Sequence, residues 1–221
     1  MSFNAVAPWY RTMEAIAFGE GLQRCRVACL GEIGSPRHAL IVGEGNGRFL
    51  CELLRAHPAV QVDCVDASER MLQLARRRVA NELPALTEQV RFLQRDITNW
   101  ASPENQYDLV VSHFLLDCFP EADLAGIIKS LASAAKPDAV WLLADFRVPT
   151  RGFARLRARV WLAVMYQFFR FTARIKASEL IDPTPFLQAE GFGLERQHLF
   201  RRGTLKSECW RNTDCKSVFR F

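Results

Sequence analysis

ALIVGEGNGRFLCEL, residues 39–53, places a short apolar run directly before a loop in which every second residue is glycine. The run 39–42 predicts a buried strand, and the apolar residues from 49 to 54 recur at the spacing of a helix. Glycine allows positive φ and lets the backbone approach a ligand closely. The loop therefore brings free backbone N–H groups, at the N-terminus of a helix, against a nucleotide-type cofactor.

Length and charge limit the class of protein. A chain of 221 residues is long enough for one domain with a sizeable core. The formal net charge is +5, but residues 151–176 hold seven basic residues and no acid, which leaves −2 for the rest of the chain. This asymmetry indicates a local basic face and argues against a nucleic-acid-binding protein.

The cysteines and the apolar runs bear on the compartment. The seven cysteines are scattered and form no CxxC pair, so we expect free buried thiols in a reducing compartment and no metal site. Arg11 and Glu14 interrupt the candidate signal peptide, and the longest apolar run, residues 160–166, is far below the roughly 20 residues that span a bilayer. We therefore expect a cytoplasmic protein.

The rest of the chain repeats the strand-then-helix pattern. Four strand-plus-helix units followed by a further strand predict a parallel sheet with helices on both faces. Two alternating runs around an Arg-Arg-Gly-Thr turn then predict a hairpin. The expected strands are 39–42, 60–65, 90–93, 107–112 and 139–144, with hairpin strands 193–200 and 205–211, and the expected helices are 21–31, 69–81, 121–135 and 179–190.

We expect one domain over residues 1–221, in which the cofactor-binding core occupies 38–147. Its other parts are an N-terminal helical segment 1–37, an aromatic and basic helical insertion 148–178, the last helix with the hairpin 179–211, and a tail 212–221. The N-terminal segment is either a lid over the cofactor mouth or a cover for the sheet. Tyr10 within it is a candidate for contact with a sulfonium or adenosine group.

If residues 153–175 form one helix, its aromatic and aliphatic residues share one arc and most of its arginines the other. Packing on the sheet, or a lid that meets a hydrophobic substrate, is the favoured interpretation. The alternative is weak contact with an anionic membrane surface through the arginines.

Two acids follow strands at the edge where ligands bind in open α/β sheets. Asp66 lies about 20 residues beyond the glycine loop, where its carboxylate can accept hydrogen bonds from both hydroxyls of a ribose. The alternative is that Asp66, or Ser68, caps the next helix. Asp96 can reach the amino group of an adenine that Ile97 covers, or it can simply be a turn residue.

His113 follows the fourth strand, where a substrate would lie, and its imidazole can take a proton near neutral pH. Because Phe114 and Leu115 follow it, the alternative is an ordinary packing residue.

Taken in order, the segments VGEGNG, VDCVDASERML, VRFLQRDI, YDLVVSHFLLDCF and LASAAKPDAVWLLADF resemble a class I S-adenosylmethionine-dependent methyltransferase over residues 38–147. The chain is most similar to the small-molecule branch that includes ubiquinone- and menaquinone-biosynthesis methyltransferases, which the opening APWYR also resembles. The resemblance implies a Rossmann-like, seven-stranded, mostly parallel α/β sheet with helices on both faces and a C-terminal antiparallel hairpin. It also implies S-adenosyl-L-methionine as the cofactor.

Carried over position by position, the resemblance implies that the loop glycines approach the methionine part of the cofactor, Asp66 binds the ribose, and Asp96 with Ile97 holds adenine. Ser112 and His113 would line the methyl-donor mouth. The full set of cofactor-binding candidates is Gly43, Glu44, Gly45, Asn46, Gly47, Asp66, Ala67, Met71, Asp96, Ile97, Ser112 and His113.

The chain departs from the family pattern at one position. Many members have an acid two residues before the first glycine, where this chain has Ile41. Contact with the methionine amino group would then pass through Glu44, backbone carbonyls or water. No NPPY-like segment follows the fourth strand, which argues against methylation of nucleic-acid bases or glutamine amides.

The expected reaction is methyl transfer to a small, apolar or aromatic acceptor. Because the sulfonium is already activated, the protein mainly aligns the reacting atoms. A base is needed only where the nucleophile must lose a proton, and the candidates are His113, Tyr10 and Asp117. Two alternatives stay open: an NAD(P)-dependent oxidoreductase, whose usual fingerprint GxGxxG differs from the GxGxG here, and a non-catalytic cofactor-binding protein that docks through residues 151–176.

Overall fold

The computed structural model describes residues 20–148 and 180–213. Tyr10, the helix expected over 153–175 and the end of the C-terminal tail lie outside the described residues. The main described elements, in chain order, are α2 (Gly21–Val27), β1 (His38–Val42), α3 (Arg48–Ala56), β2 (Gln61–Asp66), α4 (Glu69–Glu82), β3 (Val90–Gln94), β4 (Tyr107–His113), α5 (Glu121–Ala134), β5 (Ala135–Phe146), α7 (Thr184–Ala189), β6 (Phe192–Phe200) and β7 (Leu205–Asn212). Short 3₁₀ helices at 30–32, 84–89, 116–118 and 201–203 connect some of them.

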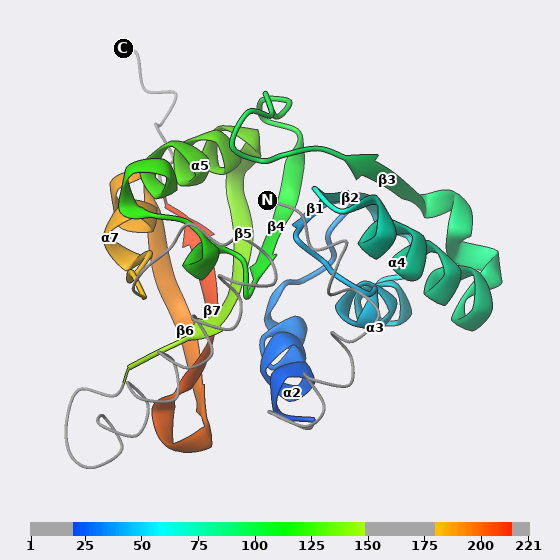
Figure 1. Ribbon diagram of the computed structural model, residues 1–221, viewed down its shortest axis with the longest axis horizontal. Coiled ribbons are helices and arrows are strands. Elements are labelled where there is room, and N and C mark those ends of the chain that lie inside the picture. The colour runs from blue at the N-terminus through cyan, green and yellow to red at the C-terminus, as the bar shows by residue number, and fades with distance from the viewer. Residues whose placement is uncertain (1–19, 149–179, 214–221) are drawn as a thin grey trace.

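The strands form one seven-stranded sheet in the order β3-β2-β1-β4-β5-β7-β6 (Figure 1). The first five run parallel, and β7 lies antiparallel between β5 and β6. The predicted fold, a mostly parallel sheet ending in an antiparallel hairpin, is confirmed. Because β1 to β5 are parallel, their carboxyl ends lie along one edge, where open α/β sheets bind ligands.

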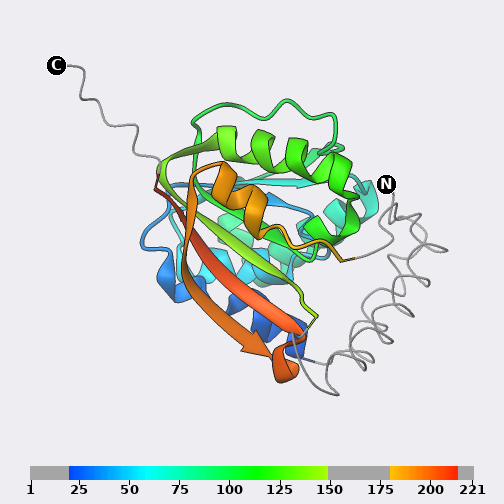
Figure 2. The ribbon, with the colours of Figure 1, turned by 90° about the vertical axis from the view of Figure 1, so that its left-hand side faces the viewer.

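Helices cover both faces of the sheet. Figures 1 and 2 show α2, α3 and α4 on one face and α5 and α7 on the other. The core is accordingly double: Phe49 and Leu53 of α3 pack into one hydrophobic cluster, and Trp141, Phe192 and Trp210 belong to the other. Burying one such large side chain contributes roughly 1.5–3 kcal/mol, so both layers stabilise the sheet.

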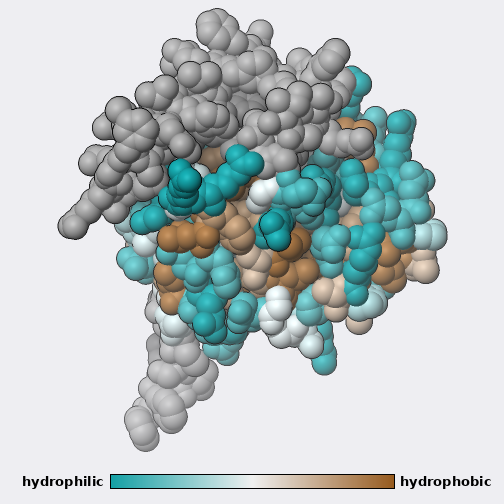
Figure 3. All heavy atoms as spheres, turned by 90° about the horizontal axis from the view of Figure 1, so that it is seen from below, coloured by the Kyte–Doolittle hydropathy of each residue, from teal (hydrophilic) through white to brown (hydrophobic). Residues whose placement is uncertain are grey.

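On the face shown in Figure 3, hydrophilic side chains surround small hydrophobic groups. Among the described residues, Leu194 and Leu199 of β6 are the large hydrophobic side chains that count as exposed. No helix in the described part of the chain is both long enough and apolar enough to cross a membrane.

Three expected elements were wrong in extent. The helix expected over 21–31 is α2, which ends at Val27, and a separate 3₁₀ turn follows at Leu30–Glu32, because Cys29 leaves helical geometry (φ −100°, ψ 10°). β5 begins at Ala135 and not at 139, since Ala135 pairs with Tyr107 across a bulge that accommodates the missing N–H of Pro137.

The helix expected over 179–190 is, within the described residues, the short α7, which starts after Pro183 and carries Pro185 in its first turn. Proline is tolerated only in the first turn of a helix, so a longer helix through these positions is disfavoured. The connection from β3 to β4, residues 95–106, contains no α-helix. Of the four expected strand-plus-helix units, the one that begins with β3 is therefore wrong. The connection is polar and contains Pro103, and several of its residues line a pocket described below.

Candidate functional site

The register of the parallel strands gathers the predicted residues at one edge. Val42 lies beside Val65 on one side and beside Ser112 on the other, and His113 lies beside Ala144. The glycine loop after β1, the last residue of β2, the last residue of β4 and the end of β5 are therefore neighbours. This edge is where the sequence predicts the cofactor mouth.

The glycine loop is held against β2 and α4. The Gly43 N–H donates to the Val65 carbonyl at 2.8 Å, which continues the sheet by one bond. At Gly47 (φ +81°) a Cβ would lie 2.8 Å from Ala75 Cα, so the absence of a side chain lets α4 pack against the loop. At Gly45 (φ +72°) a Cβ would meet no atom within 4 Å, so this backbone faces open space. Of these glycines, Gly45 is the one that leaves room for a ligand.

The Glu44 carboxylate caps α3, the helix that follows the glycine loop. Its Oε1 accepts from the Phe49 N–H at 3.0 Å and from the Leu50 N–H at 3.1 Å, in the first turn of α3. Burial raises the pKa of Glu44 to about 7, which these two bonds and the nearby Arg26 oppose. The oxygen expected to replace the missing acid at Ile41 is thus engaged in capping, and Ile41 itself is a buried core residue.

Asp66 ends β2 and faces the glycine loop. Its Oδ2 accepts from the Gly45 N–H at 3.3 Å and its Oδ1 from the Ser68 N–H at 2.8 Å. Burial raises the pKa of Asp66 to about 6, opposed by those two backbone bonds. The capping of α4 belongs to Ser68, whose Oγ accepts from the Met71 N–H at 3.3 Å. Ser68 is therefore the capping residue, while Asp66 lines the pocket and its contact with a ribose stays a prediction.

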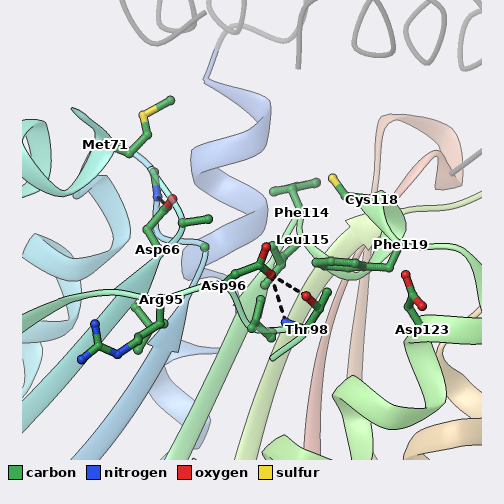
Figure 4. Close-up of a pocket in the computed structure, with 15 residues that line it drawn as sticks. Asp66, Met71, Arg95, Asp96, Thr98, Phe114, Leu115, Cys118, Phe119 and Asp123 are labelled. Atoms are coloured by element: carbon green, nitrogen blue, oxygen red, sulfur yellow. Dashed lines mark hydrogen bonds between the residues drawn. The ribbon is translucent and has the colours of Figure 1, made fainter. Parts of the chain in front are cut away.

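A pocket of about 120 Å³ opens at this edge (Figure 4). In Figure 4, Asp66, Met71 and Arg95 lie on one side, while Phe114 and Cys118 lie on the other. Its lining residues are Gly43, Gly45, Val65, Asp66, Ala67, Met71, Arg95, Asp96, Ile97, Thr98, Phe114, Leu115, Cys118, Phe119 and Asp123. Seven of the predicted cofactor-binding residues are thus brought together, from the glycine loop, the end of β2, the start of α4 and the loop after β3.

Asp96 is a turn residue that also lines the pocket, and its contact with adenine stays a prediction. Its Oδ1 accepts from the Thr98 N–H at 3.1 Å and from the Thr98 hydroxyl at 2.8 Å, which makes it a turn residue. It also lines the pocket together with Ile97 (Figure 4). The turn therefore fixes the position of a carboxylate at the pocket wall.

His113 is buried beside the pocket rather than in its lining. Its ring meets Phe49 edge to face at 4.5 Å between centroids, and neither imidazole nitrogen has a hydrogen-bond partner. Burial, and secondarily the positive charge of Arg26, holds the pKa of His113 well below its ordinary value. The Arg26 guanidinium lies 5.2 Å from the centre of the Phe114 ring. His113 is therefore a neutral imidazole with two unsatisfied nitrogens next to a pocket wall.

Five predicted residues besides His113 do not line this pocket. Asn46 is buried and its carbonyl accepts from Arg78 Nε at 2.9 Å, and the Ser112 hydroxyl accepts from Trp141 Nε1 at 2.8 Å. Asp117 is buried, and the Cys118 thiol donates to its Oδ1 at 3.6 Å. Glu44 and Gly47 are engaged as described above. The functional roles assigned to these residues stay predictions.

The pocket contains residues that sequence reasoning missed. Phe114, Leu115, Cys118 and Phe119 follow β4, and Thr98 and Arg95 follow β3. The available signal was position, since every residue just beyond a parallel strand is a candidate for the ligand edge. The residues after β4 are apolar, so the sequence favours a packing role for them over a role in the pocket. Among the described residues, no group of three or more His, Cys, Asp or Glu side chains could hold a metal ion.

Comparisons with known proteins find methyltransferases. Residues 39–138 match the family described as "Methyltransferase domain". The chain is 34% identical over 85 residues to a malonyl-[acyl-carrier protein] O-methyltransferase of Paenibacillus sp. (strain JDR-2), covering 38% of this chain and 29% of that protein. It is 36% identical over 106 residues to a trans-aconitate 2-methyltransferase of Acidovorax sp. (strain JS42), covering 48% of this chain and 37% of that protein. The matches span less than half the length of these relatives.

Solved structures share the fold. The Burkholderia thailandensis 1,6-didemethyltoxoflavin-N1-methyltransferase, solved with 1,6-didemethyltoxoflavin and S-adenosylhomocysteine, superposes with a TM-score of 0.67 at 17% identity, over 95% of this chain and 88% of that one. An N-methyltransferase from Bradyrhizobium japonicum WM9, in complex with S-adenosyl-L-homocysteine, superposes with a TM-score of 0.60 at 15% identity, over 87% and 84%. At these identities the likeness concerns the fold.

Proposed function

We propose that this chain, which belongs to the class I S-adenosylmethionine-dependent methyltransferases, transfers a methyl group from S-adenosyl-L-methionine to a small-molecule acceptor. The observation that carries the proposal is one pocket lined jointly by Gly45, Asp66 and the pair Asp96–Ile97. These are the residues that a nucleotide-type cofactor needs: open backbone, a carboxylate for the ribose and a boundary for the base.

The residues present fit this cofactor. Asp66 holds its carboxylate at the pocket with both oxygens oriented by backbone N–H groups, so lone pairs remain for ribose hydroxyls. Gly45 leaves space for close approach, and Met71 and Ile97 provide apolar surface for the nucleoside. When bound, the cofactor supplies an electrophilic methyl group on a positively charged sulfur.

The chain's own task is alignment, which in favourable cases lowers a barrier by about 7–11 kcal/mol. We propose that His113 contacts the acceptor, because its two buried nitrogens have no partner and it ends β4 one residue before the pocket-lining Phe114. A neutral imidazole both donates and accepts a hydrogen bond, so it can orient a nucleophile. Asp117 is a second candidate, and Tyr10 a third that lies outside the described residues.

Several observations favour a small, apolar or aromatic acceptor. Phe114 lines the pocket on the side away from Asp66, and its ring centroid lies 5.1 Å from that of the buried Phe146. The names of related proteins support a small acceptor and not an apolar one in particular, since malonyl-[acyl-carrier protein] and trans-aconitate carry carboxylates and 1,6-didemethyltoxoflavin is aromatic. We further propose a single domain that works in the cytoplasm. Weak membrane contact through residues 151–176 concerns a segment outside the described residues.

The comparisons do not favour the two alternatives. A nicotinamide-dependent oxidoreductase would share the glycine loop and the ribose acid, but the family match and the related proteins are methyltransferases. A cofactor-binding protein without catalysis would bind S-adenosyl-L-methionine and methylate nothing. One pair of measurements separates these possibilities.

The test combines calorimetry with a product assay. We expect the protein to bind S-adenosyl-L-methionine and not NADH or NADPH, and to release S-adenosylhomocysteine with acceptors from a panel of phenols, quinol precursors, amines and fatty acids. Asp66→Ala should weaken cofactor binding at least about 10-fold, which corresponds to the loss of about 1.4 kcal/mol from the ribose contacts. Undiminished affinity in that variant, or preferential binding of a nicotinamide cofactor, would overturn the proposal.

A further inference from the structure

A group of buried ionisable side chains lies at the end of β5, and all of its members except Asp117 are outside the residues used so far. Asp145 is 1% exposed and Asp117, in the turn after β4, is 5% exposed. Lys206 and Glu208, on the neighbouring strand β7, are exposed to 5% and 1%. Burying one charged group is costly unless it is paired, so each member of this cluster is expected to have a hydrogen-bond or ion-pair partner.

Most of the cluster is satisfied internally. Lys206 Nζ lies 3.1 Å from Glu208 Oε2 and 3.3 Å from Asp182 Oδ1. Glu208 also accepts from Gln197 at 2.7 Å and from the Trp210 indole N–H at 3.1 Å. These contacts hold the hairpin against the segment before α7 and need no ligand.

Asp145 is the exception. Its Oδ1 accepts from its neighbour's backbone, the Phe146 N–H, at 2.8 Å, while its buried Oδ2 has no hydrogen-bond partner. Burial, and secondarily the carboxylate of Asp117, raises the pKa of Asp145 well above its ordinary value, against the opposing charge of Lys206. A buried carboxylate oxygen without a donor is costly, so a proton or an incoming N–H or O–H group would stabilise it.

Asp145 does not line the pocket, but its neighbours connect it to the pocket wall. Cys118 lines the pocket, its thiol donates to Asp117, and both Asp117 and Asp145 raise the pKa of that thiol after the effect of burial. Phe114 also lines the pocket, and its ring packs against Phe146, the residue after Asp145. Figure 4 shows Phe114 and Cys118 on the side of the pocket opposite Asp66 and Met71. Asp66 and Met71 are therefore separated from the pocket wall to which Asp117 and Asp145 are connected.

We propose that Asp145 accepts the proton of the methyl acceptor, and that the acceptor therefore presents a hydroxyl or amine N–H, and not a carboxylate, at the atom that is methylated. This inference rests on the proposed function. Asp145 Oδ2 takes the hydrogen of the O–H or N–H group while the freed electron pair forms the new bond to the methyl carbon. The carbon–sulfur bond breaks, sulfur keeps its electron pair as a neutral thioether, and the proton later leaves Asp145 for solvent.

The charges around Asp145 support this acceptor class. A carboxylate acceptor brings no hydrogen to the orphaned oxygen and would be repelled by Asp117 and Asp145. A hydroxyl or amine satisfies the oxygen directly. His113, on the opposite face of the sheet at the end of β4, is the weaker proton acceptor, because its burial beside Arg26 disfavours the charged imidazolium. His113 is then left to orient the nucleophile.

The experiment compares Asp145→Asn with Asp138→Asn, a matched control. Asp138 lies on the same strand at its opposite end, is exposed, and has φ +63°, which asparagine tolerates. Each protein is assayed with phenols graded from weakly acidic phenol to nitrophenols that are ionised at the assay pH, with primary amines, and with carboxylic acids. Cofactor affinity is measured separately by calorimetry.

We expect wild type and Asp138→Asn to methylate phenols or amines and to leave carboxylic acids unchanged. Asp145→Asn should lower kcat on un-ionised phenols by about 10²–10⁴-fold, the usual contribution of a proton acceptor. The loss should shrink for nitrophenols, which need no base, while the Kd for the cofactor stays unchanged.

Equal losses on ionised and un-ionised phenols would assign Asp145 a purely structural role and overturn the proposal. So would unchanged turnover, methylation of carboxylic acids alone, or no turnover on any hydroxyl or amine. The outcomes keep the two hypotheses apart. Methylation of carboxylic acids alone sinks this inference and leaves the proposed function standing. Absent S-adenosyl-L-methionine binding, or binding without turnover on any acceptor, sinks the proposed function as well.

Discussion

Individual residues of the glycine loop have different physical roles, although the sequence presents them as equivalents. Gly47 makes room for α4, because any side chain there meets the Ala75 backbone. Gly45 faces open space at the pocket and donates its N–H to Asp66. The same residue type therefore supports packing at one position and ligand approach at the other.

Substituting these two glycines by asparagine should separate the roles, since asparagine tolerates the left-handed conformation that both adopt. Gly45→Asn should keep a melting temperature close to wild type while weakening cofactor affinity at least about 10-fold, or about 1.4 kcal/mol, by filling the pocket. Gly47→Asn should lose about 1–3 kcal/mol of stability from overpacking against α4. Thermal unfolding and calorimetry on both variants check this. A reversed pattern would mean that Gly45 is the packing residue.

The proposed contact of His113 with the acceptor can be tested by substituting this single residue. His113→Ala should lower kcat by about 10-fold, the effect of losing one orienting hydrogen bond of about 1.4 kcal/mol, and leave the cofactor Kd within about 2-fold. His38→Ala, an exposed position at the other end of the sheet, serves as the control. Steady-state kinetics and calorimetry decide the matter. Full activity in His113→Ala would remove this histidine from the reaction.

At the scale of the element, α3 is the clearest case of a helix tied to the site. It begins directly after the glycine loop, and Glu44 accepts from the N–H groups of its first turn. Phe49, Leu50 and Leu53 anchor its inner face in the core. The loop is thereby held at both ends, by β1 before it and by α3 after it, so the backbone N–H groups at the pocket are preorganised.

The raised pKa of Glu44, about 7 against an ordinary 4.5, predicts a pH dependence of stability. Between these values the folded chain keeps a proton that the unfolded chain releases, so this residue favours the folded state below pH 4.5 and loses that effect as pH rises towards 7. Glu44→Gln should therefore reduce the fall in urea midpoint between pH 5 and pH 8. An unchanged slope would show that Glu44 titrates normally.

At the scale of the whole molecule, the site depends on long-range register. The Tyr107 hydroxyl donates to Asp63 at 2.6 Å and Arg91 donates to the same carboxylate, which ties β4 to β2 and β3 across β1. With the sheet held in this way, the pocket is a property of several chain segments at once. Ligand binding should accordingly stabilise the entire fold.

S-adenosylhomocysteine at 100 times its Kd should add about 2.7 kcal/mol to the free energy of unfolding. For a chain of this size that corresponds to a rise in melting temperature of about 5–10 °C. Because the pKa of Asp66 is raised to about 6, and its ionised form is the better acceptor for ribose hydroxyls, the rise should be larger at pH 8 than at pH 5. Thermal unfolding at both pH values tests this. A larger rise at pH 5 would exclude an ionised Asp66 from the contact.

Most of the fold was predictable because it follows from local patterns. The alternation of buried strands and amphipathic helices predicted the sheet, and the run at 193–211 predicted the hairpin. The errors lie at junctions: β5 starts four residues before the expected strand because Ala135 pairs with Tyr107, a contact 28 residues away in sequence. Such pairings leave no local signal.

The site divides in the same way. By itself the sequence determined the strand-to-helix turn with its glycines and the acid at the end of β2, because backbone freedom and residue spacing are local properties. Only the tertiary structure decided that Glu44 caps its own helix, that Phe114 and Cys118 wall the pocket, and that Asp145 keeps an unpartnered oxygen behind them. The physical reason is that burial and hydrogen-bond satisfaction depend on which segments pack together, and packing is known only when the whole chain has folded.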